Sequence, residues 1–190
     1  METKQVKVFQ FDELSESAKD KARDWYANGM DIDLDFATDD IKHIASLFGL
    51  TIDRLFYSVG GYGDYCMIKG EYAYKKGALA AVRKEAPQDK ELLAIVSDLQ
   101  TLQRKHFYSL SSTLAPSGLR NGLTNVTSGD YRRFDMSDAT EDSLQEIFRA
   151  FSSWAESQLT SEYEYQTSQE SIEESIRCNE YTFLENGQRF

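Results

Sequence analysis

Residues 51–74 read TIDRLFYSVGGYGDYCMIKGEYAY and carry the clearest fold signal in the chain. Residues 51–58 form one strand candidate, and residues 66–74 alternate between apolar and polar side chains in the way a half-buried strand does. The run GGYGD at residues 60–64 between them is a turn. The simplest interpretation is a β-hairpin, which predicts an antiparallel sheet.

Outside this hairpin most of the chain has the apolar periodicity of helices. Ser15 is a candidate N-cap for a helix that ends at the Asn28-Gly29 pair, and Pro87 separates two further helices. The pattern predicts helices over 16–28, 38–48, 75–86, 88–105, 138–165 and 168–178, further strands over 5–11, 107–114 and 122–134, and a loop opening at 116–118. We therefore expect an α+β fold, an antiparallel sheet with helices packed on one face and a long C-terminal helical arm.

Length and composition fit a single domain. The chain has 190 residues, of which 41% are hydrophobic and 13% aromatic, so it can bury a core without a metal or a disulfide. We expect an α+β core over residues 1–137 and an acidic helical C-terminal region over residues 138–190 that packs on this core.

Cysteine and histidine usage argues against a metal site. Neither Cys66 nor Cys178 belongs to a C-x-x-C pair, and the histidines are only two, His43 and His106. Isolated cysteines suit a reducing compartment. The N-terminus METKQVKVFQF lacks the apolar run of a signal peptide, and no segment approaches a membrane span. We expect a soluble, cytoplasmic protein with no cofactor.

The charge of the chain is strongly acidic and unevenly distributed. A formal net charge of −11 argues against direct binding to nucleic acid or to an anionic membrane. Residues 12–64 contain 12 acids and 5 bases, residues 69–133 contain 6 acids and 11 bases, and residues 138–185 contain 12 acids and 2 bases. Two acidic flanks around a basic middle suit a protein that presents carboxylates to a basic partner.

The bases of the middle region have two interpretations. They balance charge on the protein's own surface, or they support a homo-oligomer by binding the acidic flanks of a second copy. The residues concerned are Lys75, Lys76, Arg83, Lys84, Arg104, Lys105, Arg132 and Arg133.

Five aspartates in the first acidic flank have the spacing of the start of a calcium loop. The D-x-D-x-D pattern is present, but Phe36 and Lys42 occupy the positions where such a loop needs glycine and glutamate. The residues then form a solvated acidic loop or part of a negative contact surface. They are Asp31, Asp33, Asp35, Asp39 and Asp40.

The second acidic flank interleaves glutamates with tyrosines. Most charge runs only keep a protein soluble, but here few lysines or arginines stand nearby to neutralise the acids. Tyrosine beside carboxylate suits a protein interface, because the ring offers contact area at low entropic cost. The candidate contact residues are Glu162, Tyr163, Glu164, Tyr165, Glu170, Glu173 and Glu174.

Nucleophilic catalysis would require Cys66 to lie beside His43 or His106, since a thiol needs a base within reach. Nothing local in the sequence supports such a pair, and the position of Cys66 in a predicted strand indicates a small core residue. We therefore predict no catalytic residue and expect that the chain is not an enzyme.

The turn at residues 60–64 resembles a phosphate-binding loop only in its glycines. It lacks the lysine of the G-x-x-x-x-G-K-[ST] motif, and it leads into a strand instead of a helix N-terminus. The structural interpretation is a hairpin turn, and the functional one is a loop that contacts a ligand. The loop residues are Gly61, Tyr62, Gly63 and Asp64.

Four groups of motifs follow one another along the chain. They are FDELSE at 11–16 with AK at 18–19 and ARDWY at 22–26; GD at 63–64 leading to GEYAYKKG at 70–77; LQ at 99–100 with LQR at 102–104; and NEYTF at 179–183 with Gly187. Together they resemble a family of uncharacterised phage and prophage proteins. Some members of that family carry the label antitoxin of a toxin–antitoxin stability system. The family's hairpin turn is commonly longer, with a Ser/Gly/Gln-Gly-Asp-Gly pattern.

The resemblance implies a phage accessory protein in the bacterial host cytoplasm, with no catalytic residues to carry over. Our leading hypothesis is an acidic inhibitor of a host defence complex, of the CRISPR–Cas or restriction type, whose carboxylates mimic nucleic acid on the partner's basic surface. An alternative is an antitoxin-like protein that neutralises a basic toxin. A second alternative is a nucleotide-binding module that uses the Gly60–Asp64 turn.

Overall fold

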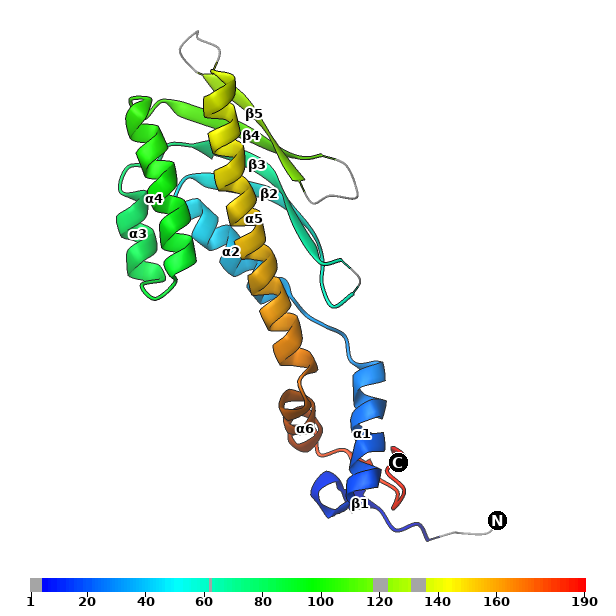
Figure 1. Cartoon of the computed structure of the whole chain (residues 1–190). Coiled ribbons are helices and arrows are strands. Elements are labelled where there is room, and N and C mark those ends of the chain that lie inside the picture. Colours follow the sequence, from blue (N-terminus) through cyan, green and yellow to red (C-terminus); the bar gives the residue numbers. More distant parts are fainter. Residues whose placement is uncertain (1–4, 62, 118–122, 131–135) are drawn as a thin grey trace. The chain divides into compact units, whose positions relative to one another are not determined.

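The computed structural model describes residues 5–61, 63–117, 123–130 and 136–190, and it confirms the predicted α+β class (Figure 1). By its internal contacts the chain divides into two compact units. We call Leu34–Ser161 the central unit, and the two chain ends, Met1–Asp33 with Glu162–Phe190, the terminal unit. This division differs from the expected boundary at residue 137, because most of the long C-terminal helix builds the core of the central unit.

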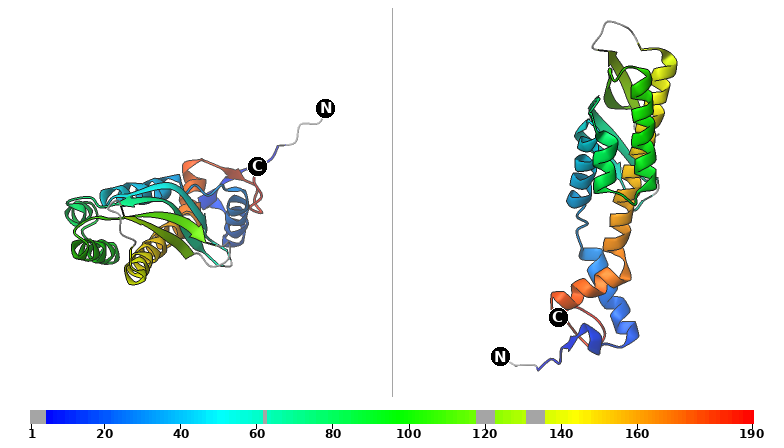
Figure 2. Two further views of the ribbon diagram at one scale, coloured as in Figure 1. Left: turned by 90° about the horizontal axis from the view of Figure 1, so that it is seen from above. Right: turned by 90° about the vertical axis from the view of Figure 1, so that its left-hand side faces the viewer.

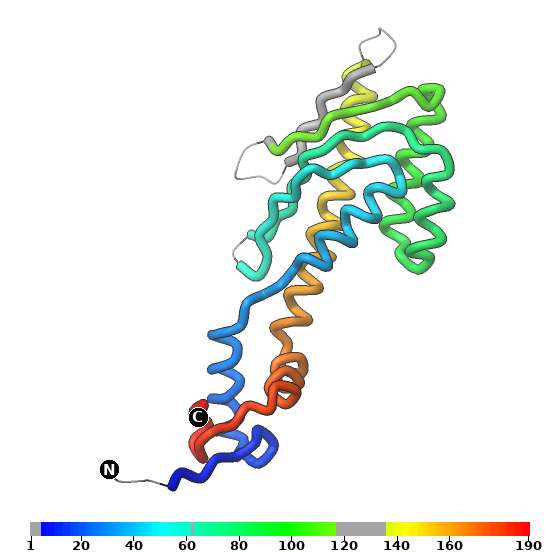
Figure 3. Tube along the Cα trace, turned by 180° about the vertical axis from the view of Figure 1, so that it is seen from behind, coloured from blue at the N-terminus to red at the C-terminus, as the bar shows by residue number. Residues whose placement is uncertain are grey.

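The central unit contains a helix-covered antiparallel sheet. Its elements are α2 (Asp35–Leu47), β2 (Leu50–Ser58), β3 (Tyr65–Ala73), α3 (Ala78–Glu85), α4 (Lys90–Lys105), β4 (Leu110–Ser117), β5 (Leu123–Asp130) and most of α5 (Asp138–Thr167). The strands pair antiparallel in the order β2-β3-β4-β5. Figure 3 shows β2, β3 and β4 side by side from behind.

The predicted hairpin is confirmed. β2 and β3 pair antiparallel, with Ser58 opposite Tyr65 at the turn. The register shifts after Ile52, which leaves one extra residue in β2. An extra residue reverses the alternation of side chains along a strand. Ile52 and Leu55 therefore lie on the same face of the sheet although they are three residues apart.

Helices cover one face of the sheet, as predicted, and Figure 2 shows this layer from two further directions. From Ile68 to Ala73 the side chains of β3 alternate, with Ile68 and Tyr72 buried and Lys69 and Glu71 exposed. The Tyr72 ring packs edge-on against Phe148 of α5, with 5.2 Å between the ring centroids. Such alternation is typical of an antiparallel sheet with one solvated face.

A buried glutamine joins α4 to the sheet. Gln103 Nε2 donates to the Tyr72 hydroxyl (2.9 Å) and to the Leu110 carbonyl (2.8 Å), while its Oε1 accepts from the Leu110 N–H (3.2 Å). Phe107 and Tyr108, which precede β4, have left-handed backbone with φ of 55° and 60°. The strand therefore begins at Leu110, and the predicted start at residue 107 is wrong.

Two further predicted boundaries in the central unit are wrong. Helix α2 begins at Asp35, three residues before the predicted start. Pro116 lies inside β4 rather than in a loop, opposite Thr124 of β5. β3 pairs with β4 only as far as Leu114, so no residue of β3 pairs with Pro116. A proline, which has no N–H to donate, is tolerated at such a position.

The terminal unit is built from both ends of the chain. Its elements are β1 (Phe9–Gln10), the 3₁₀ helix η1 (Phe11–Glu13), α1 (Glu16–Gly29), the last turn of α5, α6 (Gln169–Cys178) and β6 (Thr182–Phe183). The strand predicted over 5–11 is thus reduced to two residues, because η1 begins at Phe11. β1 and β6 pair antiparallel, with Phe9 opposite Phe183.

A small apolar cluster holds the terminal unit together. Its buried members are Phe11, Leu14, Ala18, Ala22, Ile172, Ile176 and Phe183. Gly187 closes against this cluster with φ of +85°, and a Cβ at this position would lie 2.1 Å from the Ala18 carbonyl oxygen. Only glycine can adopt this backbone conformation so close to the Ala18 carbonyl. The turn at Gly187 therefore packs directly against the backbone of α1.

Candidate functional site

The two units differ in charge. The terminal unit, 62 residues long, has 15 acids and 7 bases and a formal charge of −8. The central unit, 128 residues long, has 17 acids and 14 bases and a formal charge of −3. The uneven distribution seen in the sequence therefore places most of the net charge on the smaller unit.

An ion-pair network on α1 and α6 uses several bases of the terminal unit. Arg23 pairs with Glu173 (2.7 Å) and Asp20 (2.6 Å), and Arg177 pairs with Glu173 (2.8 Å) and Asp12 (3.0 Å). These cations are consequently neutralised inside the unit and do not offset the carboxylates elsewhere on its surface.

Glu173 is the centre of this network. Its side chain is 16% exposed, and it accepts hydrogen bonds from Gln169 (2.9 Å), Arg177 and Arg23. These bonds, with the one from Gln169 as the largest cause, lower the pKa of Glu173 from 4.5 to about 2. Of the predicted contact residues, Glu173 thus serves the internal structure of the unit.

Several other carboxylates of the terminal unit are exposed and form no ion pair within the described part of the chain. They are Asp24, Asp31, Glu164, Glu170, Glu174, Glu180 and Glu185. Glu170 and Glu174 are one turn apart on α6 and therefore share a face of that helix. The exposed surface of this unit is predominantly negative.

The other predicted residues at the end of α5 have different surroundings. Glu164 and Tyr165 are exposed, with 62% of the Tyr165 side chain accessible, whereas Glu162 and Tyr163 are half-buried. Glu162 accepts a hydrogen bond from Gln166 Nε2 (2.7 Å). The segment thus offers one exposed carboxylate beside one exposed tyrosine.

The five predicted aspartates do not all belong to one unit. Asp31 and Asp33 follow α1 in the terminal unit, while Asp35, Asp39 and Asp40 lie on α2 in the central unit. All five are exposed, and Asp39 pairs with Lys42 (2.9 Å). Phe36, beside Asp35 on the first turn of α2, is 85% exposed. The sequence did not identify it as a candidate contact residue.

The predicted loop site forms the tip of the β2–β3 hairpin. Gly61 donates its N–H to Asp64 Oδ1 (3.2 Å), and Gly63 has φ of +91°. Tyr62 lies outside the described residues. Because the Asp64 carboxylate already takes the Gly61 N–H, that donor is not directed at a ligand in this conformation.

Cys66 is buried, as the sequence predicted. Burial and, secondarily, the negative charge of Glu156 raise the pKa of the Cys66 thiol to about 12. In the described residues no hydrogen bond joins it to a histidine: His43 approaches Glu85 (3.7 Å), and His106 contacts Thr140. This arrangement does not activate the thiol.

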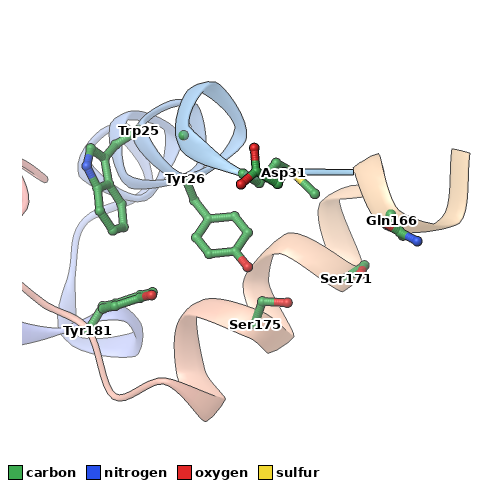
Figure 4. Close-up of a pocket in the computed structure, with 9 residues that line it drawn as sticks. Trp25, Tyr26, Asp31, Gln166, Ser171, Ser175 and Tyr181 are labelled. Atoms are coloured by element: carbon green, nitrogen blue, oxygen red, sulfur yellow. The ribbon is translucent and has the colours of Figure 1, made fainter. Parts of the chain in front are cut away.

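A pocket of about 360 Å³ lies in the terminal unit (Figure 4). Trp25 and Tyr26 of α1 line it together with Tyr181, and the Trp25 and Tyr181 rings meet edge-on with centroids 5.2 Å apart. Polar residues complete the lining, and they include Asp31, Gln166, Ser171 and Ser175. Of these seven residues, the sequence reasoning had selected Asp31.

The other pocket residues could not be selected from the sequence. Trp25 and Tyr26 lie within the predicted helix over 16–28, and Tyr181 stands about 155 positions away in a motif that the sequence linked only to a family resemblance. The Trp25-Tyr26 and Tyr181 motifs do both belong to that resemblance, which was the one available signal that they act together.

An α+β chain with an acidic terminal unit is the class that these features define. The chain belongs to the family described as domain of unknown function (DUF8835), which it matches over residues 34–169. The match begins at Leu34, where the central unit begins, and ends at the first residue of α6. No curated protein and no solved structure matches the chain.

Over residues 5–61, 63–117, 123–130 and 136–190, every helix is too short or too polar to span a lipid bilayer. The same residues contain no group of three or more His, Cys, Asp or Glu side chains that could hold a metal ion.

Proposed function

We propose that this chain is a protein-binding protein whose terminal unit presents carboxylates to a basic, nucleic-acid-binding surface of a partner. One observation carries the proposal. Arg23 and Arg177 form ion pairs with acids of the same unit, namely Glu173, Asp20 and Asp12. A larger set of carboxylates is exposed and forms no ion pair in the described part of the chain.

Electrostatic complementarity explains how such a surface would act. A partner that binds nucleic acid carries lysines and arginines placed to neutralise phosphates. Carboxylates held on helices at the end of α5 and on α6 provide a negative field for the same groups, and Tyr165 adds exposed aromatic area for the contact. Binding of this kind weakens as salt rises.

The biological role we propose is inhibition of a host defence complex, of the CRISPR–Cas or restriction type, in the bacterial cytoplasm. The resemblance to phage and prophage proteins supports this role. The buried, unactivated thiol of Cys66 supports a binding role over a catalytic one.

A plating assay on a defended host tests the proposal. Expression of the wild-type chain should restore phage plating, and the triple reversal Glu164→Lys, Glu170→Lys and Glu174→Lys should abolish the effect. A matched control reverses three exposed acids of the central unit, Asp98, Asp142 and Glu146, and should keep it. The proposal is wrong if the wild-type chain never restores plating, or if both triple variants act like wild type.

An antitoxin role is the second candidate, because the same acidic surface would also neutralise a basic toxin. Co-expression separates the two roles. Rescue of growth from one toxin, lost in the Glu164, Glu170 and Glu174 reversal, would support the antitoxin, whereas restored plating without such rescue would support the inhibitor.

A further inference from the structure

The pocket beside α1 combines features that select for a cation. Its aromatic wall consists of Trp25, Tyr26 and Tyr181, and Asp31 lies at its edge (Figure 4). The faces of aromatic rings attract cations, and tryptophan does so most strongly. Asp31 is exposed and forms no ion pair within the described part of the chain, so its charge is available to a ligand.

The same rings already accept a guanidinium group. Arg189 places its guanidinium carbon 4.8 Å from the centroid of the Tyr181 ring and 5.7 Å from that of Trp25. Trp25 and Tyr181 also line the pocket, whereas Arg189 does not. The geometry and chemistry of the rings therefore suit a planar cation.

Oxygen acceptors stand opposite the rings. Ser171 and Ser175 are one turn apart on α6, and Figure 4 shows their side chains on the side of the Tyr26 hydroxyl. Their hydroxyl groups make no hydrogen bond within the described residues. Hydroxyl oxygens and a carboxylate can each accept the N–H groups of a guanidinium, which has five donors and no acceptor.

The Asp31 segment is held in place by α5. The Gln166 side chain accepts a hydrogen bond from the Asp33 N–H (3.1 Å) and donates one to the Asp33 carbonyl. This two-way bond fixes the backbone two residues from Asp31. A carboxylate on a fixed segment loses less entropy when it binds a ligand than one on a free loop.

We propose that this pocket binds an arginine side chain of the basic partner. Arginine is favoured over lysine because its planar head stacks on aromatic faces and pairs with a carboxylate through two parallel bonds. This inference rests on the proposed function, in which the partner has a basic surface. It adds that one arginine of that surface enters the pocket.

The test uses the full-length, ¹⁵N-labelled protein and a blocked single amino acid, N-acetylarginine methylamide. The chain has two tryptophans, so two indole N–H signals report on two places: Trp25 in the pocket and Trp154, which is buried in the central unit. We expect a saturable shift of the Trp25 signal and none of the Trp154 signal. The uncharged citrulline compound and the lysine compound should bind more weakly.

Two isosteric variants provide the matched comparison. Asp31→Asn should weaken binding of the arginine compound about tenfold, since it removes a charge-assisted pair. Asp24→Asn, at an exposed carboxylate of α1 that does not line the pocket, should leave binding unchanged. The absence of a saturable Trp25 shift, or equal affinity in the Asp31→Asn variant, would overturn the proposal, and equal binding of lysine would overturn the assignment to arginine.

Failure of the pocket and failure of the proposed function give different results. If the arginine compound binds but the chain restores no plating, the pocket assignment stands and the proposed function falls. If plating is restored but the compound does not bind, the acidic surface acts without this pocket and the inference is wrong.

Discussion

The central and terminal units are stabilised in different ways. The central unit packs helices on an antiparallel sheet around large buried side chains such as Phe148 and Phe151. The terminal unit has a small apolar cluster and a network of ion pairs in which Glu173 links Arg23 and Arg177. The central unit, which the family match covers, thus depends on burial, and the terminal unit depends partly on charge.

This difference means that changes of surface charge should affect the stability of the two units differently. A unit whose core is apolar tolerates changes of surface charge, because those changes leave its packing intact. In the terminal unit the acids have two environments: Glu173 takes part in the ion pairs that stabilise the fold, while Glu170 and Glu174, on the same helix, are exposed. Variants can therefore change the exposed acids without disturbing the ion pairs.

The largest effect should come from the core of the central unit. Phe148→Ala removes a fully buried ring that packs on Tyr72, and it should lower the free energy of unfolding by about 3–5 kcal/mol. Denaturant unfolding followed by circular dichroism measures this loss. Phe36→Ala is the control, since that ring is 85% exposed, and its effect should stay within about 0.5 kcal/mol. Similar losses in both variants would contradict the burial argument.

The next largest effect should come from the buried hydrogen bonds of Gln103. Gln103→Leu keeps the approximate size of the side chain but leaves the N–H and carbonyl of Leu110 without their partner, which should cost about 2–3 kcal/mol. Amide exchange at Leu110 should increase at the same time. Unchanged exchange at this position would show that the glutamine does not hold the start of β4.

A smaller and pH-dependent effect is expected in the terminal unit. Because the pKa of Glu173 is lowered from 4.5 to about 2 in the folded chain, its ionised form favours folding. This contribution is complete above the ordinary pKa of 4.5 and is lost as the pH falls toward 2. At neutral pH, Glu173→Gln should therefore destabilise α1 and α6 by about 2 kcal/mol.

Hydrogen exchange of the α1 and α6 amides between neutral pH and pH 3 measures this contribution. The wild type should lose protection as the pH falls, and the Glu173→Gln variant should lose less. Glu174→Gln is the control, because Glu174 is exposed and forms no ion pair in the described residues. If the pH profile of Glu173→Gln were identical to that of the wild type, Glu173 would not be the cause of the pH dependence.

The sequence was sufficient for the elements that local patterns determine. The hairpin follows from glycines between two alternating segments, and the end of α1 at Gly29 follows from an Asn-Gly pair. The start of β4 could not be predicted, since apolar Phe107 and Tyr108 continue a strand pattern in sequence. Their left-handed backbone precedes the hydrogen bonds of Gln103, which joins Leu110 of β4 to Tyr72 of β3, and Tyr72 stands 31 positions from Gln103.

The candidate site was harder to predict from the sequence than the fold, because it depends on contacts between distant residues. The acidic flanks are visible in composition, but composition does not show which acids are paired. Glu173 was grouped with Glu170 and Glu174, and its partner Arg23 stands 150 positions away. The pocket likewise joins Trp25 to Tyr181, and only the folded chain brings the two together. Contacts between distant segments decide which exposed residues remain free to bind.

The smallest expected effect on stability concerns the two thiols, one in each unit. Cys178 is exposed at the end of α6, whereas burial raises the pKa of the Cys66 thiol to about 12, so Cys66 remains protonated and shielded at pH 8. In the native protein, iodoacetamide should label Cys178 alone, and Cys66 should react only after unfolding in denaturant. Mass spectrometry of the labelled peptides distinguishes the sites, and Cys178→Ser should change stability by less than about 0.5 kcal/mol. Rapid labelling of Cys66 under native conditions would mean that the central unit opens readily, which would contradict the argument that burial protects this thiol.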